Sequence, residues 1–300
     1  MFLAWVYERL GPIRSLWRDY LDLTKPGVTA VIVLSALTVL LVASDGLPPV
    51  GTIVLLVMGG SLAVGGANAM NCCLDADIDA LMTRTADRPL AAHRLDLKNS
   101  FTFGMALVVI SFFILSIGIN LLAGVLAMLA VFIHVVIYTG RLKRSSPYSI
   151  LVGAIPGAMA PLIGWVAARG TLNPEAFLFF AILFCWTPIH FWSLALSMRR
   201  EYLRAGIPSL PVVYGLQTTR IHLGGLAVLM VMVSILPVGF GLLNSFYALS
   251  AMLLGGFYIY FASTLMIMPS LRTSWRLYKF SMQYLALLLA AMVVDWVFFF

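Results

Sequence analysis

The sequence is poor in charge, because only 10% of its 300 residues are Asp, Glu, Lys or Arg, whereas 62% are hydrophobic. Soluble domains carry roughly 25% charged and 45–50% apolar residues. The composition therefore excludes a soluble globular protein. Apolar stretches of about 20 residues, the length that crosses a bilayer, recur along the chain. They leave no room for a sizeable domain outside the membrane, so any chemistry must lie among helices or on short loops.

Cysteine is also scarce, and the three cysteines, Cys72, Cys73 and Cys185, cannot form a disulfide framework or a CxxC metal site. A cleavable signal peptide is not expected, because charged residues interrupt the start of the chain and no apolar core precedes a small-residue cleavage site. Residues 1–26 combine charge with tryptophan and are predicted to lie at the membrane interface.

We expect an all-α integral membrane protein that forms one domain over residues 1–300. The predicted transmembrane helices are nine: residues 27–44, 50–71, 101–119, 121–139, 148–168, 176–197, 223–243, 246–268 and 281–299.

The distribution of basic residues predicts the topology. All but one of the 19 Lys and Arg residues fall at one end of this bundle, and only Arg169 falls at the other. Because positive charge marks the cytoplasmic side, the N-terminus is expected inside and the C-terminus outside. The net charge of +7 is then an orientation signal, and no nucleic-acid partner is expected. Acidic residues gather between Asp75 and Asp96 on the same side, so a site would open inward.

The strongest chemical pattern follows the second predicted helix and reads NCCLDADIDALMTRTADRPL from Asn71 to Leu90. Asn71, Asp75 and Asp79 are spaced by four residues, so on a helix they share one face. Oxygen ligands of this kind suit Mg²⁺, which is usually bound by one or two carboxylates plus substrate phosphates. Arg84 and Arg88, again four residues apart, are suited to phosphate oxygens. The pattern predicts a metal and phosphate site.

Asp77 lies between the two predicted ligands and points away from their face if the helix continues. Two roles are compatible with this position: Asp77 binds a second ion, or it acts in the site only if the helix unwinds there.

The pattern N-x3-D-x-D-I-D-x2-M-x-R-T-x2-R-P-L resembles the first aspartate-rich motif of the UbiA superfamily of intramembrane prenyltransferases. Two further stretches resemble the heme-farnesylating branch of that superfamily: residues 138–147, and residues 186–215 with WTPIHFW and AGIPSLPVVYG. The resemblance extends from residue 24 to residue 215 in motifs and to the C-terminus in the pattern of spans. It implies a UbiA-type helix bundle.

The resemblance also implies a reaction, in which heme B, farnesyl diphosphate and water give heme O and diphosphate with Mg²⁺ as cofactor. The implied Mg²⁺ ligands are Asn71, Asp75 and Asp79, and the implied diphosphate contacts are Arg84 and Arg88. The two aspartates and the two arginines are the expected catalytic residues. The product would supply a heme-copper oxidase, so heme A synthase or terminal oxidase assembly proteins are conceivable partners beside membrane lipid. The absence of a transit peptide favours a prokaryotic plasma membrane.

Further candidates for substrate binding lie in the other stretches. Lys143 offers a second basic side chain, and Tyr138 and Trp186 offer aromatic faces to an allylic cation. His190 is the first candidate for heme contact, ahead of His134. Superfamily members carry a second motif, DxxxD, where this chain offers the single acid Glu201, which is expected to belong to the site.

Three alternatives remain. The same fold acting on an aromatic quinone precursor is the nearest, and WTPIHFW with the single acid Glu201 disfavours it. A transporter or channel would place ionisable residues at mid-membrane and a polar path to the outer side, which the sequence lacks. A structural oxidase-assembly subunit would not need the row from Asn71 to Asp79.

Overall fold

The computed structural model describes residues 16–299, and regular structure in this range is helical without any strand. Nine of the helices described are long and apolar enough to cross a bilayer. They are α2 (Pro26–Ala43), α3 (Val50–Leu74), α5 (Leu97–Gly118), α6 (Leu121–Phe132) with its continuation η1 (Ile133–Thr139), α7 (Ser149–Arg169), α8 (Ala176–Ser197), α11 (Gly215–Gly239), α12 (Ser245–Ile267) and α13 (Leu271–Phe299). The prediction of an all-α protein with nine transmembrane helices is confirmed.

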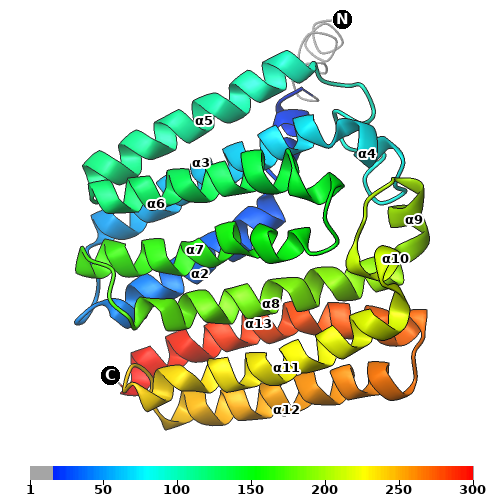
Figure 1. Cartoon of the computed structure of the whole chain (residues 1–300). Helices are drawn as coiled ribbons and strands as arrows, with labels where there is room; N and C mark the ends of the chain where they lie inside the picture. Colours follow the sequence, from blue (N-terminus) through cyan, green and yellow to red (C-terminus); the bar gives the residue numbers. More distant parts are fainter. Residues whose placement is uncertain (1–15, 300) are drawn as a thin grey trace, which may run out of the picture.

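The helices form one bundle with α2, α7, α8 and α13 in its middle (Figure 1). On one side α3, α5 and α6 complete the bundle, and on the other side α11 and α12. Three short helices gather at one end of it: α4 (Ala76–Ala80), α9 (Arg199–Arg204) and α10 (Leu210–Val213). The segments that follow α3 and α8 therefore lie together at the same end.

Close packing of α3 against α5 depends on two glycines. A Cβ atom on Gly66 would lie 2.6 Å from the carbonyl oxygen of Gly104, and one on Gly104 would lie 2.9 Å from that of Gly66. Only glycine permits backbones to approach this closely. The contact fixes α3, whose end carries the Asn71 row.

Two helices begin well before their predicted starts, α11 at Gly215 instead of residue 223 and α13 at Leu271 instead of residue 281. Their first turns are polar, so a hydropathy pattern does not detect them. At the start of α13, Ser270 Oγ accepts from Thr273 N–H at 3.1 Å and caps the helix. Hydropathy detects the apolar part of a helix, whereas capping and backbone hydrogen bonds decide where the helix begins.

The predicted interfacial segment lies partly outside the described residues, since the structure describes nothing before residue 16. Residues 16–23 are helical, and Arg94 donates to Asp19 Oδ1 at 3.0 and 3.1 Å. This contact joins the segment to the loop between α4 and α5.

At the opposite end of the bundle, the side chain of Asp295 is completely buried and accepts from two backbone N–H groups at the start of α12. The donors are Asn244 at 2.7 Å and Tyr247 at 2.9 Å. A buried carboxylate in this place satisfies N–H groups that the helix leaves unpaired.

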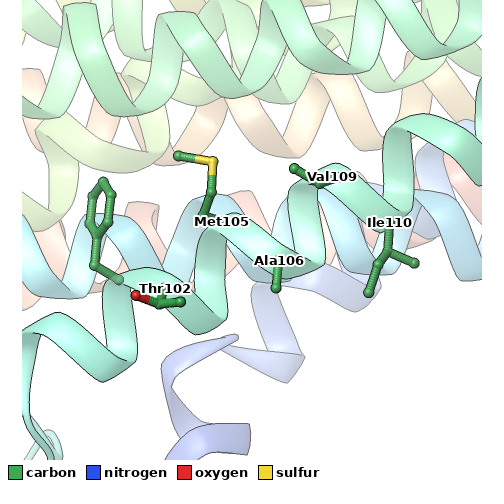
Figure 2. A pocket seen from close by; sticks show the side chains of 6 residues that line it. Thr102, Met105, Ala106, Val109 and Ile110 are labelled. Atoms are coloured by element: carbon green, nitrogen blue, oxygen red, sulfur yellow. The ribbon is translucent and has the colours of Figure 1, made fainter.

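A shallow open depression lies along α5 (Figure 2). Its lining is Phe101, Thr102, Met105, Ala106, Val109 and Ile110. No charged side chain lines it, and these exposed apolar residues suit contact with lipid rather than chemistry.

Candidate active site

The row of Asn71, Asp75 and Asp79 crosses the junction between α3 and α4. The α-helix α3 ends at Leu74, and Asp75 has φ −100° and ψ 2° before α4 begins at Ala76. The four-residue repeat persists across the break, because Asp75 N–H donates to the Asn71 carbonyl at 3.0 Å and Asp79 N–H to the Asp75 carbonyl at 2.8 Å. All three side chains are buried. They keep their common register although the helix itself does not run through.

Asn71 is held by three partners from different parts of the chain. Its Oδ1 accepts from Lys25 Nζ at 2.6 Å, and its Nδ2 donates to Asp75 Oδ2 at 2.8 Å and to Thr139 Oγ1 at 3.0 Å. Lys25 precedes Pro26 at the start of α2 and adopts the left-handed conformation, with φ 48°. Burial lowers the pKa of its ammonium group. A strained backbone and a partly buried charge at one position are typical of a functional site.

Asp75 combines an ion pair with an unused oxygen. Lys143 Nζ lies 2.5 Å from Asp75 Oδ2, and the exposed fractions of the two side chains are 18% and 1%. The other carboxylate oxygen, Oδ1, is buried and has no hydrogen-bond partner among the described residues. An orphaned buried oxygen is costly unless a ligand satisfies it.

Asp79 is paired with Arg88, whose Nη1 lies 2.6 Å from Asp79 Oδ2. Thr85 supports the loop between them, because its hydroxyl donates to the Asp79 carbonyl at 3.0 Å. Arg84 is exposed and makes no protein hydrogen bond in the described part of the chain. Its charge acts on Tyr202, whose pKa is raised by burial and lowered, to a smaller extent, by Arg84. Of the two predicted phosphate-binding arginines, Arg88 contacts the row through Asp79, and Arg84 is exposed.

Glu201 binds the facing loop instead of the carboxylate row. Its two oxygens accept from Thr83 N–H at 3.0 Å and from Thr83 Oγ1 at 2.6 Å. Ile78 and Met82 pack on Ile207 beside this contact. The segments that follow α3 and α8 are thus joined directly over the site end of the bundle.

Asp77 points away from the row, as its spacing predicts, and is exposed. Arg144 donates to its carboxylate from Nη1 at 2.7 Å and from Nη2 at 2.6 Å, and Nη2 also donates to the Leu74 carbonyl at 2.6 Å. The hydrogen bond from Arg144 is the largest influence on Asp77 and lowers the pKa of its carboxyl group.

The π-helical segment η1 carries Tyr138 and Thr139 to the row. Thr139 Oγ1 accepts from Asn71 and donates to the His134 carbonyl at 2.8 Å, which a π-helix brings into reach five residues back. Tyr138 packs on Gly153, where a Cβ atom would lie 2.7 Å from the ring. The ring of His134 lies 5.8 Å from that of Tyr138, and its Nε2 is buried without a partner among the described residues.

His190 and Trp186 form a separate group between α8 and α13. The His190 ring stacks on Trp186 with centroids 4.6 Å apart, and the Tyr278 ring lies at the same distance from it. His190 Nδ1 lies 2.7 Å from Ser281 Oγ, and Trp186 Nε1 donates to the Ser281 carbonyl at 2.7 Å. Ser281 Oγ donates its proton to the Tyr278 carbonyl at 2.6 Å, so it accepts from His190 Nδ1–H. Nε2 of the neutral ring then carries a lone pair and no hydrogen bond within the described chain.

Sequence reasoning missed several members of this arrangement. The charge pattern predicts only an orientation role for Lys25, whereas its position before Pro26 at a helix start is the feature of the sequence that distinguishes it. Thr139 and Ser281 carry no distinctive spacing, since their partners lie 68 and 91 residues away.

The residues fit a magnesium ion that substrate phosphates help to hold. Within residues 16–299, no three His, Cys, Asp or Glu side chains gather as a complete metal cage. Two carboxylates and an amide oxygen in one row, with Asp75 Oδ1 unpartnered, match a cation bound by one or two carboxylates plus phosphate oxygens. The surrounding cations, Lys25, Lys143 and Arg88, suit a polyanion.

The profile of the UbiA prenyltransferase family matches residues 32–290. A protoheme IX farnesyltransferase of Roseiflexus sp. (strain RS-1) is 42% identical over 285 residues, which are 95% of this chain and 53% of that protein. The chain thus spans about half the length of the first curated relatives it matches. A protein of the same name from Teredinibacter turnerae is 38% identical, with 93% of this chain and 90% of that protein covered.

Solved structures share the fold. A digeranylgeranylglyceryl phosphate synthase superposes with a TM-score of 0.79 at 19% identity, covering 94% of this chain and 98% of that one. A UbiA homologue from Archaeoglobus fulgidus bound to DMAPP and Mg²⁺ superposes with a TM-score of 0.67 at 16% identity, covering 92% and 99%. The nine apolar helices and this family likeness make the chain a multi-pass membrane protein.

Proposed function

The chain belongs to the UbiA prenyltransferase family, and from that premise we propose that it is a heme O synthase. It would convert heme B, farnesyl diphosphate and water to heme O and diphosphate. One observation carries the proposal: a buried row of Asn71, Asp75 and Asp79, on which three basic side chains converge, ends a membrane-spanning helix. Such a row would bind a diphosphate at the edge of the bilayer, while the prenyl chain would lie among the apolar helices.

Asn71, Asp75 and Asp79 would hold Mg²⁺, and Asp75 Oδ1 is the oxygen that already lacks a partner. When bound, the ion supplies positive charge that stabilises the departing diphosphate.

The chain's own cations bind and orient the diphosphate. Lys143 Nζ lies at Asp75, Lys25 Nζ at Asn71 and Arg88 at Asp79, so all three reach a group placed on the row. When the allylic C–O bond breaks, the electron pair leaves with the diphosphate oxygen. The three side chains donate to oxygens that gain negative charge in this step, which favours the transition state. Exposed Arg84 adds a contact from the outer side.

The acceptor side is proposed around His190. Its Nε2 lone pair is free because Ser281 holds the proton on Nδ1, and a neutral imidazole in this state can ligate heme iron. Trp186 fixes the ring by stacking, and Tyr138 lies in η1 next to Thr139, which is hydrogen-bonded to Asn71 of the row. Both aromatic rings would shield an allylic cation from water.

We propose that residues 1–300 form a single domain whose N-terminus and site end face the cytoplasm of a bacterial cell. The basic side chains gathered at the ends of α3, α8 and α13 support this orientation. The relatives named above come from bacteria, which supports the plasma membrane. Heme A synthase or a terminal oxidase assembly protein would receive the product.

The test incubates the purified protein with heme B, farnesyl diphosphate and Mg²⁺, followed by mass analysis of the extracted hemes. We expect a heme heavier by one farnesyl group and one hydroxyl group. Asp75→Asn should abolish it, whereas Asp87→Asn, an exposed acid of the same loop, should not. Prenylation of an added aromatic acceptor instead of heme would contradict the proposed substrate and keep the reaction class. Equal turnover by wild type and Asp75→Asn would contradict the proposed site.

A further inference from the structure

Asp77 and Arg144 stand outside the proposed ligand set, yet their contact is the most extensive side-chain link at the α3–α4 junction. Arg144 ends the short helix η2 (Leu142–Arg144). It donates twice to the Asp77 carboxylate and once to the Leu74 carbonyl, with all three distances at 2.6 or 2.7 Å. A bidentate guanidinium–carboxylate pair fixes orientation as well as distance.

Two neighbouring pairs join the same two segments. Lys143 binds Asp75 on the buried side, and Arg144 binds Asp77 on the exposed side. In the described chain, these two side chains of η2 are the ones that hydrogen-bond to the junction. The inner pair, Asp75 and Lys143, must exchange its ion pair for ligand contacts when substrate binds, since Asp75 is a proposed metal ligand and Lys143 a proposed diphosphate donor. The outer pair, Asp77 and Arg144, has no proposed ligand contact and can stay paired.

We propose that Asp77 and Arg144 are positioning residues that hold η2 against the α3–α4 junction, so that Lys143 stays beside the diphosphate after its ion pair with Asp75 is exchanged for ligand contacts. The inference rests on the proposed prenyltransferase function and assigns Asp77 a role other than binding an ion. Without the outer pair, η2 would contact the row only through the ligand, and the nearest remaining protein tie would be the hydrogen bond between Asn71 and Thr139 in the preceding segment η1. Binding would then have to order the segment, which weakens affinity.

The chain offers a matched control at the opposite end of the bundle. Arg169 donates to the Asp45 carboxylate from Nη1 at 2.6 Å and from Nη2 at 2.9 Å. The side chains of this pair are partly exposed, as are those of the Asp77–Arg144 pair. No proposed site residue adjoins that pair. Exposed ion pairs by themselves contribute little to stability, so the two pairs differ mainly in what lies next to them.

The experiment compares Asp77→Asn, Arg144→Gln, the double variant, and the exchange Asp77→Arg with Arg144→Asp. Asp45→Asn serves as the control. Binding of inorganic pyrophosphate with Mg²⁺ to the detergent-solubilised protein is measured by calorimetry, and KM and kcat are measured for farnesyl diphosphate and for heme. We expect each single variant to raise the pyrophosphate Kd and the farnesyl diphosphate KM about tenfold, with the KM for heme unchanged. The double variant should be no worse than either single one, and the exchange should restore most of the loss.

Several results would overturn the inference: strictly additive single effects, an equal rise in the KM for heme, or changes no larger than those of Asp45→Asn. Thermal unfolding identifies a variant that fails to fold, and restoration by the exchange excludes that explanation. If wild type makes no farnesylated heme while the pyrophosphate affinities follow the expected pattern, the proposed acceptor is wrong and the positioning role is supported.

Discussion

The ammonium nitrogen of Lys143 lies 2.5 Å from a carboxylate oxygen of Asp75, whose side chain is only 1% exposed. The same carboxylate leaves its second oxygen without a partner. Lys143 therefore pairs with one oxygen of the buried Asp75 carboxylate and leaves the other without a partner. A bound metal ion would contact the free oxygen, and a diphosphate would accept from the Lys143 ammonium group.

Lys143→Met should destabilise the ligand-free protein, because it leaves the buried Asp75 carboxylate without its counter-charge. Breaking a buried pair in this way costs about 3 kcal/mol. Thermal unfolding in detergent checks this, with and without Mg²⁺, which should restore part of the loss. Lys279→Met removes an exposed lysine from the same end and should change little. A melting temperature equal to that of wild type would show that the pair does not stabilise the fold.

Lys25→Met should raise the KM for farnesyl diphosphate about tenfold, because the variant loses an ammonium group that lies 2.6 Å from Asn71 Oδ1. Steady-state kinetics with both substrates varied are the measurement. The KM for heme should be unaffected, since Lys25 lies on the carboxylate row and not beside His190. If Lys25 were only an orientation charge, membrane insertion would change and the KM of inserted protein would not.

His190→Ala should abolish the optical shift that ferric heme B undergoes when a histidine ligates its iron. Ser281→Ala should weaken binding several-fold, because it removes the acceptor that holds the proton on Nδ1 and leaves Nε2 as the free nitrogen. Absorption spectra during heme titration report both effects. His222→Ala is the control, since that ring belongs to α11 and is held there by the Thr218 carbonyl of the same helix. If His190→Ala still ligated the heme iron as wild type does, another residue would be the ligand. His134, whose Nε2 has no partner among the described residues, would be replaced next.

Glu201→Ala should raise the KM for farnesyl diphosphate without changing the Mg²⁺ concentration that gives half-maximal activity. The reason is that Glu201 binds Thr83 at 2.6 and 3.0 Å and so holds the loop that carries Arg84. Thr83→Val removes only the hydroxyl contact and should give a smaller change in the same direction. A large increase in the required Mg²⁺ would make Glu201 a metal ligand instead.

Asp295→Ala should lower stability by about 2 kcal/mol, because it leaves two backbone N–H groups at the start of α12 without an acceptor. The kcat of the folded fraction should stay unchanged, because this residue lies at the end of the bundle opposite the site. Thermal unfolding and active-site-normalised kinetics are measured together. A loss of kcat at unchanged stability would contradict a capping role.

Much of the site was predictable from local spacing. Asn71, Asp75 and Asp79 recur every four residues, and the backbone bonds between them preserve that register even where α3 gives way to α4. Asp77, two residues out of step, was predicted to point elsewhere and does so. Glu201 was expected in the site, but spacing could not reveal Thr83 as its partner, because the two residues lie 118 positions apart.

The sequence by itself determined the environment of the molecule. A chain with 10% charged residues and recurrent apolar stretches must place its helices in a bilayer, and the one-sided distribution of its basic residues predicts the orientation. The tertiary structure decided which charges meet. Lys25 reaches Asn71 across 46 residues and Lys143 reaches Asp75 across 68, because α2, α3 and η1 pack side by side. Contacts of that kind depend on how helices pack in three dimensions, and no periodicity within one helix encodes them.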